Sequence, residues 1–178
     1  MDADGDIVLR PLWRRDDPQT IADVKRLWAA GGIPAASIES RQKELCAAAY
    51  IGDELAAVST AGIYFDPAMR NNFFAYRCMV APQFRRRNLA WRISAYSLDL
   101  LKNWSAQNPE ARILGLMIVV ETEKFAEGLR SPIRENFGVA MHFVGYTMAG
   151  QQLRVVWFDD AKLDDAAAVR RGLGGASA

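Results

Sequence analysis

Residues 73–90 carry the sequence FFAYRCMVAPQFRRRNLA, and the fold prediction starts from them. The first eight, Phe73–Val80, are rich in aromatic and apolar residues and predict a strand that a nearby proline ends. A long amphipathic helix is predicted next, from about residue 86 to Gln107. Ile113–Val120 is then a continuous apolar run, as expected for a strand covered on both faces. Together these segments predict a parallel strand–helix–strand unit with a right-handed crossover.

Weaker sequence patterns predict further helices and strands before and after this unit in the chain. Before it, they predict a strand Ile7–Leu12, a helix capped by Asp17 with Pro18 at its first position, a second helix Ile38–Leu45, and strands Ala47–Ile51 and Leu55–Phe65 joined at Gly52-Asp53. After it, residues 123–142 have helical character broken at Ser131-Pro132, followed by strands Tyr146–Met148 and Leu153–Phe158. The sequence therefore predicts one α/β domain over residues 1–163 and a flexible tail over 164–178.

The composition excludes several classes of protein. Hydrophobic residues make up 51% of the 178, which excludes disorder as the main state. Lys and Arg number 22 against 21 Asp and Glu, so the net charge of +1 argues against nucleic acid as a general partner. With two cysteines and one histidine, neither a Cys/His metal site nor a disulfide framework is expected. No secretory signal or membrane-length apolar run is visible, so we expect a cytoplasmic protein without a membrane partner.

Three consecutive arginines, Arg85, Arg86 and Arg87, lie between the predicted strand and the predicted long helix. A helix start presents free backbone N–H groups and the positive end of the helix dipole. Open parallel sheets also bind their ligands at this end of the strands. The pattern indicates a site for an anion, most naturally a phosphate. Two other interpretations stay open, a solvated surface turn and a contact with nucleic acid.

The segment Val80–Ala90 resembles motif A of the Gcn5-related N-acetyltransferase (GNAT) superfamily, V-x-P-x-x-(R/Q)-x-x-G-x-(G/A). The residues that fit it are Val80, Pro82, Arg85, Leu89 and Ala90. The order of the predicted elements, β-α-α-β-β-β-α-β-α-β-β, is also that of the family. The resemblance covers roughly residues 5–160. It implies a single α/β domain with a mixed central sheet flanked by helices and splayed between the fourth and fifth strands.

The resemblance implies an activity as well as a fold. It implies that an acetyl or other acyl group moves from acyl-CoA to an amine of a small molecule or peptide, by direct attack and without a metal. It places CoA against Cys78, Met79, Val80, Arg85, Arg86, Arg87, Asn88, Leu89 and Ala90. A backbone N–H near Met79 or Val80 would polarise the thioester carbonyl. Members of the family often dimerise, so a homodimer is left open.

Two departures from the family pattern bear on activity. Asn88 stands where the family usually has glycine, and its Cβ adds bulk beside the phosphates. The second family motif is shortened: Asn136 leads to Gly145-Tyr146 without the tyrosine that usually precedes the glycine as general acid. These departures support an alternative, a catalytically altered protein of this fold that binds CoA or another ligand as a sensor or interaction domain.

Candidates for proton transfer are few. Tyr76 shares a strand face with Cys78 and Val80, and Glu121 follows the predicted strand Ile113–Val120 at the same sheet end as the arginines. Tyr76 is open to a second interpretation as a packed core residue, and Glu121 as a solvated charge. The acceptor pocket is expected among the first helices, the turn at 66–72 and the segment near Ser131-Pro132.

Overall fold

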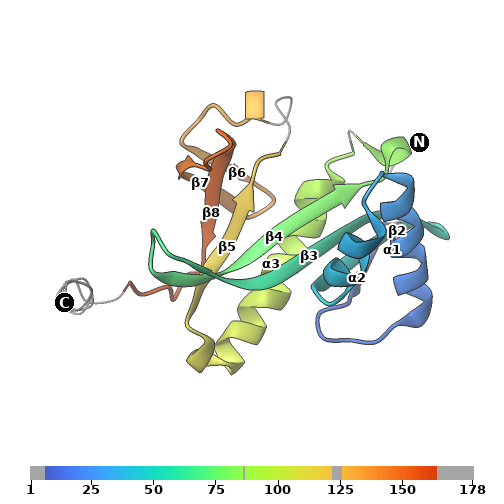
Figure 1. Ribbon diagram of the computed structural model, residues 1–178, viewed down its shortest axis with the longest axis horizontal. Helices are drawn as coiled ribbons and strands as arrows, with labels where there is room; N and C mark the ends of the chain where they lie inside the picture. The colour runs from blue at the N-terminus through green and yellow to red at the C-terminus, as the bar shows by residue number, and fades with distance from the viewer. Residues whose placement is uncertain (1–6, 86, 122–125, 164–178) are drawn as a thin grey trace.

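One sheet of eight strands, in the order β1-β2-β3-β4-β5-β8-β7-β6, runs through the described part of the chain, residues 7–85, 87–121 and 126–163 of a computed structural model (Figure 1). The first half of the chain supplies β1 (Ile7–Pro11), α1 (Pro18–Ala30), α2 (Ala35–Gln42), β2 (Leu45–Ile51), β3 (Glu54–Asp66) and β4 (Asn71–Val80). The second half supplies the 3-10 turn η1 (Pro82–Phe84), α3 (Leu89–Gln107), the 3-10 turn η2 (Pro109–Ala111), β5 (Ile113–Val119), β6 (Ile133–Asn136), β7 (Val139–Tyr146) and β8 (Gln152–Trp157).

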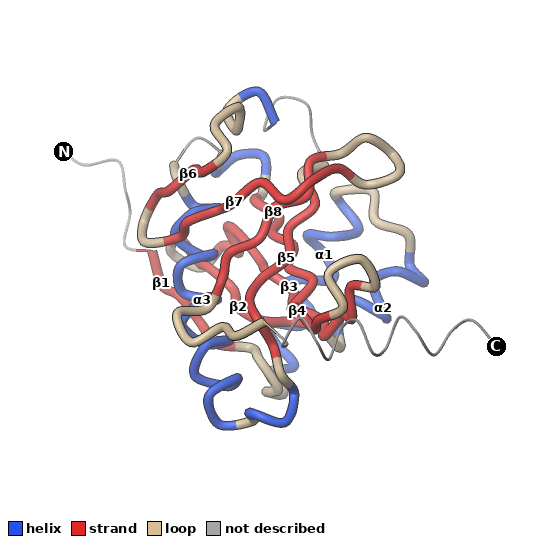
Figure 2. The backbone as a smooth tube through the Cα atoms, turned by 90° about the vertical axis from the view of Figure 1, so that its left-hand side faces the viewer, coloured by secondary structure: helices blue, strands red, loops and turns tan. Residues whose placement is uncertain are grey.

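Helices cover both faces of the sheet. Figure 2 shows α3 on one side and α1 and α2 on the other. Alternation along β2 explains this arrangement, because successive side chains of a strand point to opposite faces. Ala47 and Ala49 pack against Ile93 of α3, whereas Ala48 lies in the cluster with Trp28 of α1. Small alanines on β2 let both helices lie close to the sheet.

The central unit confirms the prediction made from residues 73–120. β4 and β5 are parallel neighbours joined through α3. A bulge lies near the start of β5, because Asn72 pairs with Ile113 but Phe74 pairs with Leu116. Gly115 falls in this bulge, where a Cβ would lie 2.1 Å from the carbonyl oxygen of Val156. Bulges increase local twist, which helps to turn the far end of β5 away from β4.

The prediction for the region after β5 is wrong in two elements. The predicted strand Tyr146–Met148 does not form, because Tyr146 is the last residue of β7. Residues 133–146 form a hairpin of β6 and β7, although helical character was predicted over residues 123–142. Phe137 and Gly138 form the two-residue turn, with φ of 50° and 73°. Positive φ at both central residues is typical of hairpin turns whose twist matches the strands. Asn136 therefore ends a strand, so the second family motif has no helical counterpart here.

Other boundaries shift by a few residues. The carboxylate of Asp17 caps α1 by accepting a hydrogen bond from the Thr20 N–H at 3.1 Å, as the sequence predicted. α2 begins at Ala35 and ends at Gln42, three residues earlier at each end than predicted. The predicted flexible tail, 164–178, lies outside the described residues.

Candidate functional site

β4 and β5 separate before β4 ends. The last pair between them is Tyr76 with Ile118, whereas β4 continues to pair with β3 as far as Val80. The two strands diverge beyond that point (Figure 1). The edge of β4 that faces β5 therefore carries unpaired backbone groups over residues 77–80. This is the splay that the family resemblance implied.

The alternation of the β4 backbone shows which residues face the splay. The Ala81 N–H donates to the carbonyl oxygen of Ala56, a residue of β3, so the Ala81 N–H faces β3. Successive residues of a strand direct their N–H groups to opposite edges, so Met79 also faces β3. Cys78 and Val80 consequently present their N–H and C=O groups to the open edge. Two residues there can pair with an extended polar ligand as a further strand would.

The turn from β4 into α3 leaves backbone N–H groups at the helix start without a side-chain cap. Asn88 precedes the helix, and its carbonyl accepts a hydrogen bond from the Arg92 N–H at 3.0 Å. Within the described residues, no side chain caps the first N–H groups of α3. The N–H groups of Leu89 and Ala90 have no intrahelical acceptor, so they are available to an anion.

Asn88 adopts the left-handed conformation, with φ of 55° and ψ of 15°. Asparagine tolerates this conformation better than most residues, whereas glycine adopts it without steric cost. Asn88 thus forms a left-handed turn at the position where the family motif usually has glycine. Its exposed side chain adds atoms beside the open N–H groups.

Two of the three arginines can be placed around this turn. Arg85 is exposed, and the guanidinium of half-buried Arg87 lies 5.7 Å from the centre of the Phe84 ring. Arg86 lies outside the described residues. Positive charge therefore flanks the free N–H groups of α3, and such an arrangement can bind a phosphate group.

Tyr76 is buried beneath α3, at 4% exposure, and its hydroxyl lies 3.0 Å from the Ser94 hydroxyl. Burial raises the pKa of Tyr76, because the surrounding protein disfavours the phenolate. A buried, hydrogen-bonded hydroxyl on the α3 side favours the packing interpretation of this residue. Its role in proton transfer stays a prediction.

Cys78 is exposed to solvent, and protein atoms also surround its thiol. The residue is exposed, yet desolvation raises the pKa of its thiol to about 12. Because Cys78 is exposed, a ligand can reach it. Because the pKa of its thiol is raised, the thiol stays protonated near neutral pH. Cys78 is therefore suited to lining a site and poorly suited to acting as a nucleophile.

The remaining candidate named from the sequence is Glu121, and two other titratable residues, Glu123 and His142, lie in the same half of the chain. Glu121 is exposed just beyond β5, after Val120, whose N–H donates to the Gln152 carbonyl at 2.9 Å. It is at the same end of the sheet as the α3 start, because β4 and β5 are parallel. Glu123 lies outside the described residues. His142 is half-buried on β7 opposite Val155, and its Nδ1 has no partner among the described residues.

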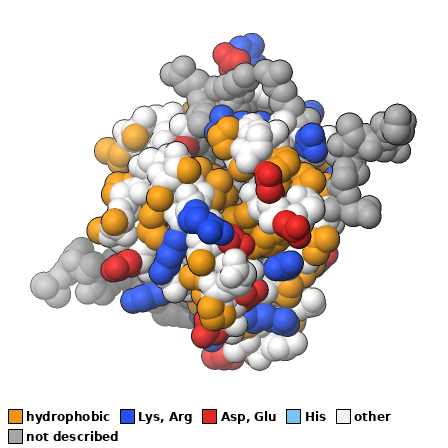
Figure 3. Space-filling model, turned by 90° about the vertical axis from the view of Figure 1, so that its right-hand side faces the viewer, with side chains coloured by type: hydrophobic (Ala, Val, Ile, Leu, Met, Phe, Trp, Pro, Cys, Tyr) orange, Lys and Arg blue, Asp and Glu red, His pale blue; other side chains and the backbone are white. Residues whose placement is uncertain are grey.

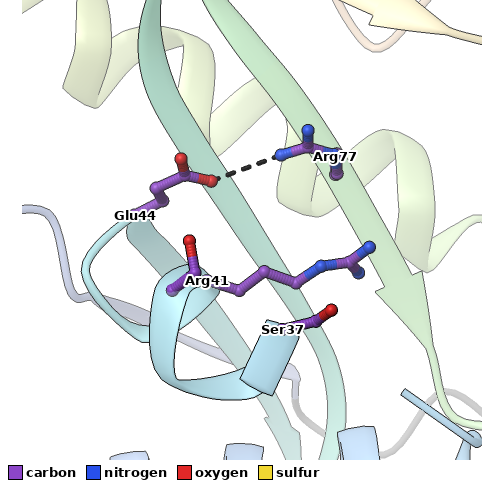
Figure 4. Close-up of a pocket in the computed structure, with 5 residues that line it drawn as sticks. Ser37, Arg41, Glu44 and Arg77 are labelled. Carbon is purple, nitrogen blue, oxygen red and sulfur yellow. Dashed lines mark hydrogen bonds and ion pairs between the residues drawn. The ribbon is translucent and has the colours of Figure 1, made fainter. Parts of the chain in front are cut away.

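A polar pocket on the other face of β4 was not predicted in detail. Ser37, Ser40, Arg41, Glu44 and Arg77 line it (Figure 4). The sequence predicted that the first helices would contribute to an acceptor pocket, but the predicted start of α2 at Ile38 excluded Ser37 from the helix. With the observed bounds, Ser37 and Arg41 are four residues apart on one helix face, a spacing that could have revealed the pocket.

Within the described residues, no group of His, Cys, Asp and Glu side chains could hold a metal ion. No helix in this part of the chain is both long and apolar enough to cross a membrane.

Solved acetyltransferase structures resemble this chain in fold. NAA60 from Arabidopsis thaliana, in complex with acetyl-CoA, is similar over 86% of this chain and 100% of its own, with a TM-score of 0.55 and 14% identity. A GNAT-family acetyltransferase from Bacillus cereus is similar over 86% and 97%, with a TM-score of 0.55 and 10% identity. The ribosomal-protein-S18-alanine N-acetyltransferase from Escherichia coli is similar over 89% and 99%, with a TM-score of 0.50 and 13% identity.

No protein-family model matches the chain, and no curated protein matches it in sequence. At these identities the likeness defines the fold. The chain has the fold of the Gcn5-related N-acetyltransferases, with a mixed sheet that opens between β4 and β5.

Proposed function

We propose that the protein transfers an acetyl or other acyl group from acyl-CoA to an amine. The observation that carries this proposal is the unpaired edge of β4 followed along the chain by the uncapped start of α3. CoA has an extended arm with amide groups and a pyrophosphate, and these two surfaces are complementary to those two parts. The fold shared with proteins that bind acetyl-CoA supports the same assignment.

In this proposal each part of CoA has its own contacts. The N–H groups of Leu89 and Ala90 bind the pyrophosphate, with charge from Arg85 and Arg87. Arg86 belongs to the same run of arginines in the sequence. The pantetheine arm lies along the open edge at Cys78 and Val80.

Backbone N–H groups along β4 alternate between the β3 edge and the open edge, and only one on the open edge can polarise the thioester carbonyl. Because the Met79 N–H faces β3, we assign this role to the Val80 N–H. Negative charge develops on the thioester oxygen during attack, and a fixed N–H donor stabilises it.

The reaction itself needs no covalent enzyme intermediate. The neutral amine nitrogen attacks the thioester carbon, a C–N bond forms, and the C–S bond breaks. One proton leaves the amine and one is taken up by the departing CoA thiolate. Glu121 is the more accessible candidate for the first transfer, whereas Tyr76 is buried.

Calorimetry with acetyl-CoA tests the binding step. Arg85→Glu should weaken binding about tenfold, because it replaces attraction to the phosphates with repulsion. Arg134→Glu makes the same charge change on β6, which three other strands separate from β4 in the sheet, and should leave the affinity unchanged. Absence of acetyl-CoA binding by the unaltered protein would refute the proposal.

A second function is favoured by a specific observation. The hairpin of β6 and β7 stands where the family motif has a helix, and no tyrosine takes the general-acid position before Gly145. A protein that binds CoA without transferring an acyl group is consistent with this. Release of free CoA thiol with a panel of primary amines separates the two, because a sensor binds acetyl-CoA but releases no thiol.

A further inference from the structure

The polar pocket on the α2 side of β4 lies beside the point where β4 leaves β5. It has a volume of about 170 Å³ and is lined by Ser37, Ser40, Arg41, Glu44 and Arg77. Arg77 is the first β4 residue beyond the last pair with β5. A pocket of this size suits a small ligand or one end of a larger one.

The backbone of β3 makes room for the acidic group of this pocket. A Cβ on Gly62 would lie 2.6 Å from Oε1 of Glu44, so the Glu44 carboxylate in its present position packs directly over this glycine. Glu44 Oε2 accepts a hydrogen bond from Arg77 Nη1 at 3.3 Å. Both side chains keep substantial exposure, 33% for Glu44 and 44% for Arg77. The pair therefore orients Arg77 while leaving its guanidinium accessible.

Arg41 supplies a second guanidinium without a carboxylate partner. In Figure 4 its side chain extends from α2 toward β4, beside the Glu44–Arg77 pair and near Ser37. Among the described residues, no ion pair or hydrogen bond engages the Arg41 guanidinium. Two guanidiniums face one carboxylate, so the pocket has one uncompensated positive charge. A carboxylate is complementary to two planar guanidiniums and neighbouring hydroxyls.

A buried hydroxyl at the same place also lacks a partner. Thr60 of β3 is directly opposite Arg77 of β4, so both side chains lie on the same face of the sheet. Thr60 is 4% exposed, and its Oγ1 has no hydrogen bond within the described residues. Buried hydroxyls are rarely left unpaired. The unpaired Thr60 hydroxyl is thus a buried neighbour of Arg77, although Thr60 is not among the residues that line the pocket.

We propose that the acceptor is a small primary amine that also carries a carboxylate, and that Arg41 and Arg77 bind this carboxylate. The inference rests on the proposed acyl transfer, because the amine must reach the thioester at Val80. Val80 is three positions beyond Arg77 on β4, about 10 Å along the strand. The amine and the carboxylate of the acceptor are accordingly several bonds apart, as in an ω-amino acid.

Binding of 5-aminopentanoate and of its methyl ester to the full chain tests the proposal without CoA. The unaltered protein should bind the acid about tenfold more tightly than the ester, since only the acid pairs with the guanidiniums. Arg41→Gln should abolish this preference. Arg134→Gln, on the far strand β6, should keep it, and thermal melting should show that both variants are folded.

A CoA-release assay with the same two amines and acetyl-CoA should show the same preference for the acid. Equal binding of acid and ester, or a preference that Arg41→Gln leaves intact, would overturn the proposal. If acetyl-CoA does not bind but the Arg41-dependent preference for the acid is present, the carboxylate pocket stands and the proposed acyl transfer falls.

Discussion

The backbone conformation of Asn88 controls how closely a phosphate can approach α3. Its φ of 55° is accessible to asparagine and costs glycine nothing. We expect Asn88→Gly to keep the turn, to remove the side chain beside the Leu89 and Ala90 N–H groups, and to leave acetyl-CoA affinity unchanged or higher. Calorimetry measures the affinity.

Asn88→Ala is the matched variant, because it also removes the amide but keeps a Cβ. Alanine at this φ should lower the free energy of unfolding by about 1 kcal/mol. A large loss of acetyl-CoA affinity in both variants would instead show that the Asn88 amide binds the ligand.

The geometry of Tyr76 favours a stabilising role. Tyr76→Phe removes the hydrogen bond with Ser94 and should lower the free energy of unfolding by about 1 kcal/mol, with little change in turnover. Denaturant unfolding and a CoA-release assay measure the two quantities. Tyr64→Phe, at an exposed position of β3, is the matched control and should change neither. Slower turnover with unchanged stability would support proton transfer by Tyr76.

The start of α1 provides a pH-dependent contribution to stability. The Asp17 carboxylate accepts hydrogen bonds from the Thr20 N–H and hydroxyl, at 3.1 and 2.7 Å, and the first of these is the main cause of its lowered pKa. Protonation weakens both bonds. The contribution is therefore fully present above the ordinary carboxyl value of 3.8 and is lost as the pH falls through the lower pKa of the folded state.

Asp17→Ala should lower the free energy of unfolding by about 1 kcal/mol at neutral pH. The difference from the unaltered protein should shrink below pH 3.8. Chemical denaturation over a pH series measures it. Asp16→Ala, at the exposed neighbouring position, should show no comparable loss, and an equal loss would mean that the cap does not depend on Asp17.

The elements that sequence reasoning identified have strong local signals. α1 has an aspartate cap and a proline at its first turn, and β5 is an unbroken apolar run, so local chemistry is sufficient to define them. The β6–β7 hairpin was missed because its turn, Phe137-Gly138, lacks the Asn-Gly or Asp-Gly pair typical of such turns. The alternation of buried Val139 and Met141 was the available strand signal.

One part of the candidate site could be predicted from local sequence and another part could not. The phosphate-binding turn is a short contiguous motif, so its residues could be predicted from their order. The α2 pocket joins Arg41 and Glu44 to Arg77, which lies over thirty residues further along the chain. Only the pairing of β3 with β4 and the packing of α2 bring these residues together, and neither follows from local sequence.

The near-zero net charge of the whole molecule is consistent with an anion site that depends on a few local residues. The totals, 22 basic and 21 acidic residues, nearly cancel. On the side of the molecule shown in Figure 3, basic and acidic side chains are interspersed among apolar ones. Attraction of a polyanion along this side is therefore weak. Binding of CoA phosphates depends on where Arg85 and Arg87 lie, and net charge contributes little.

A buried arginine links the second half of the sheet to the segment after β5. Arg154 of β8 is 1% exposed, and it donates hydrogen bonds to the carbonyl oxygens of Leu129, Ser131 and Met141. Burial lowers the pKa of Arg154, because the charged form loses solvation. These bonds hold two segments, the loop at Leu129 and Ser131 and the strand β7 at Met141, against β8.

Removal of this link should weaken the whole domain. Arg154→Met keeps much of the side-chain volume but leaves the carbonyl oxygens unpaired, so we expect a loss of about 2 kcal/mol and a fall in Tm of roughly 4–8 °C. Arg134→Met, at an exposed position of β6, is the control and should leave Tm nearly unchanged. Calorimetric melting measures both. Because β4 and the start of α3 are built from other segments, acetyl-CoA affinity of the folded Arg154→Met protein should be preserved. An unchanged Tm would show that packing alone holds the segment after β5 in place.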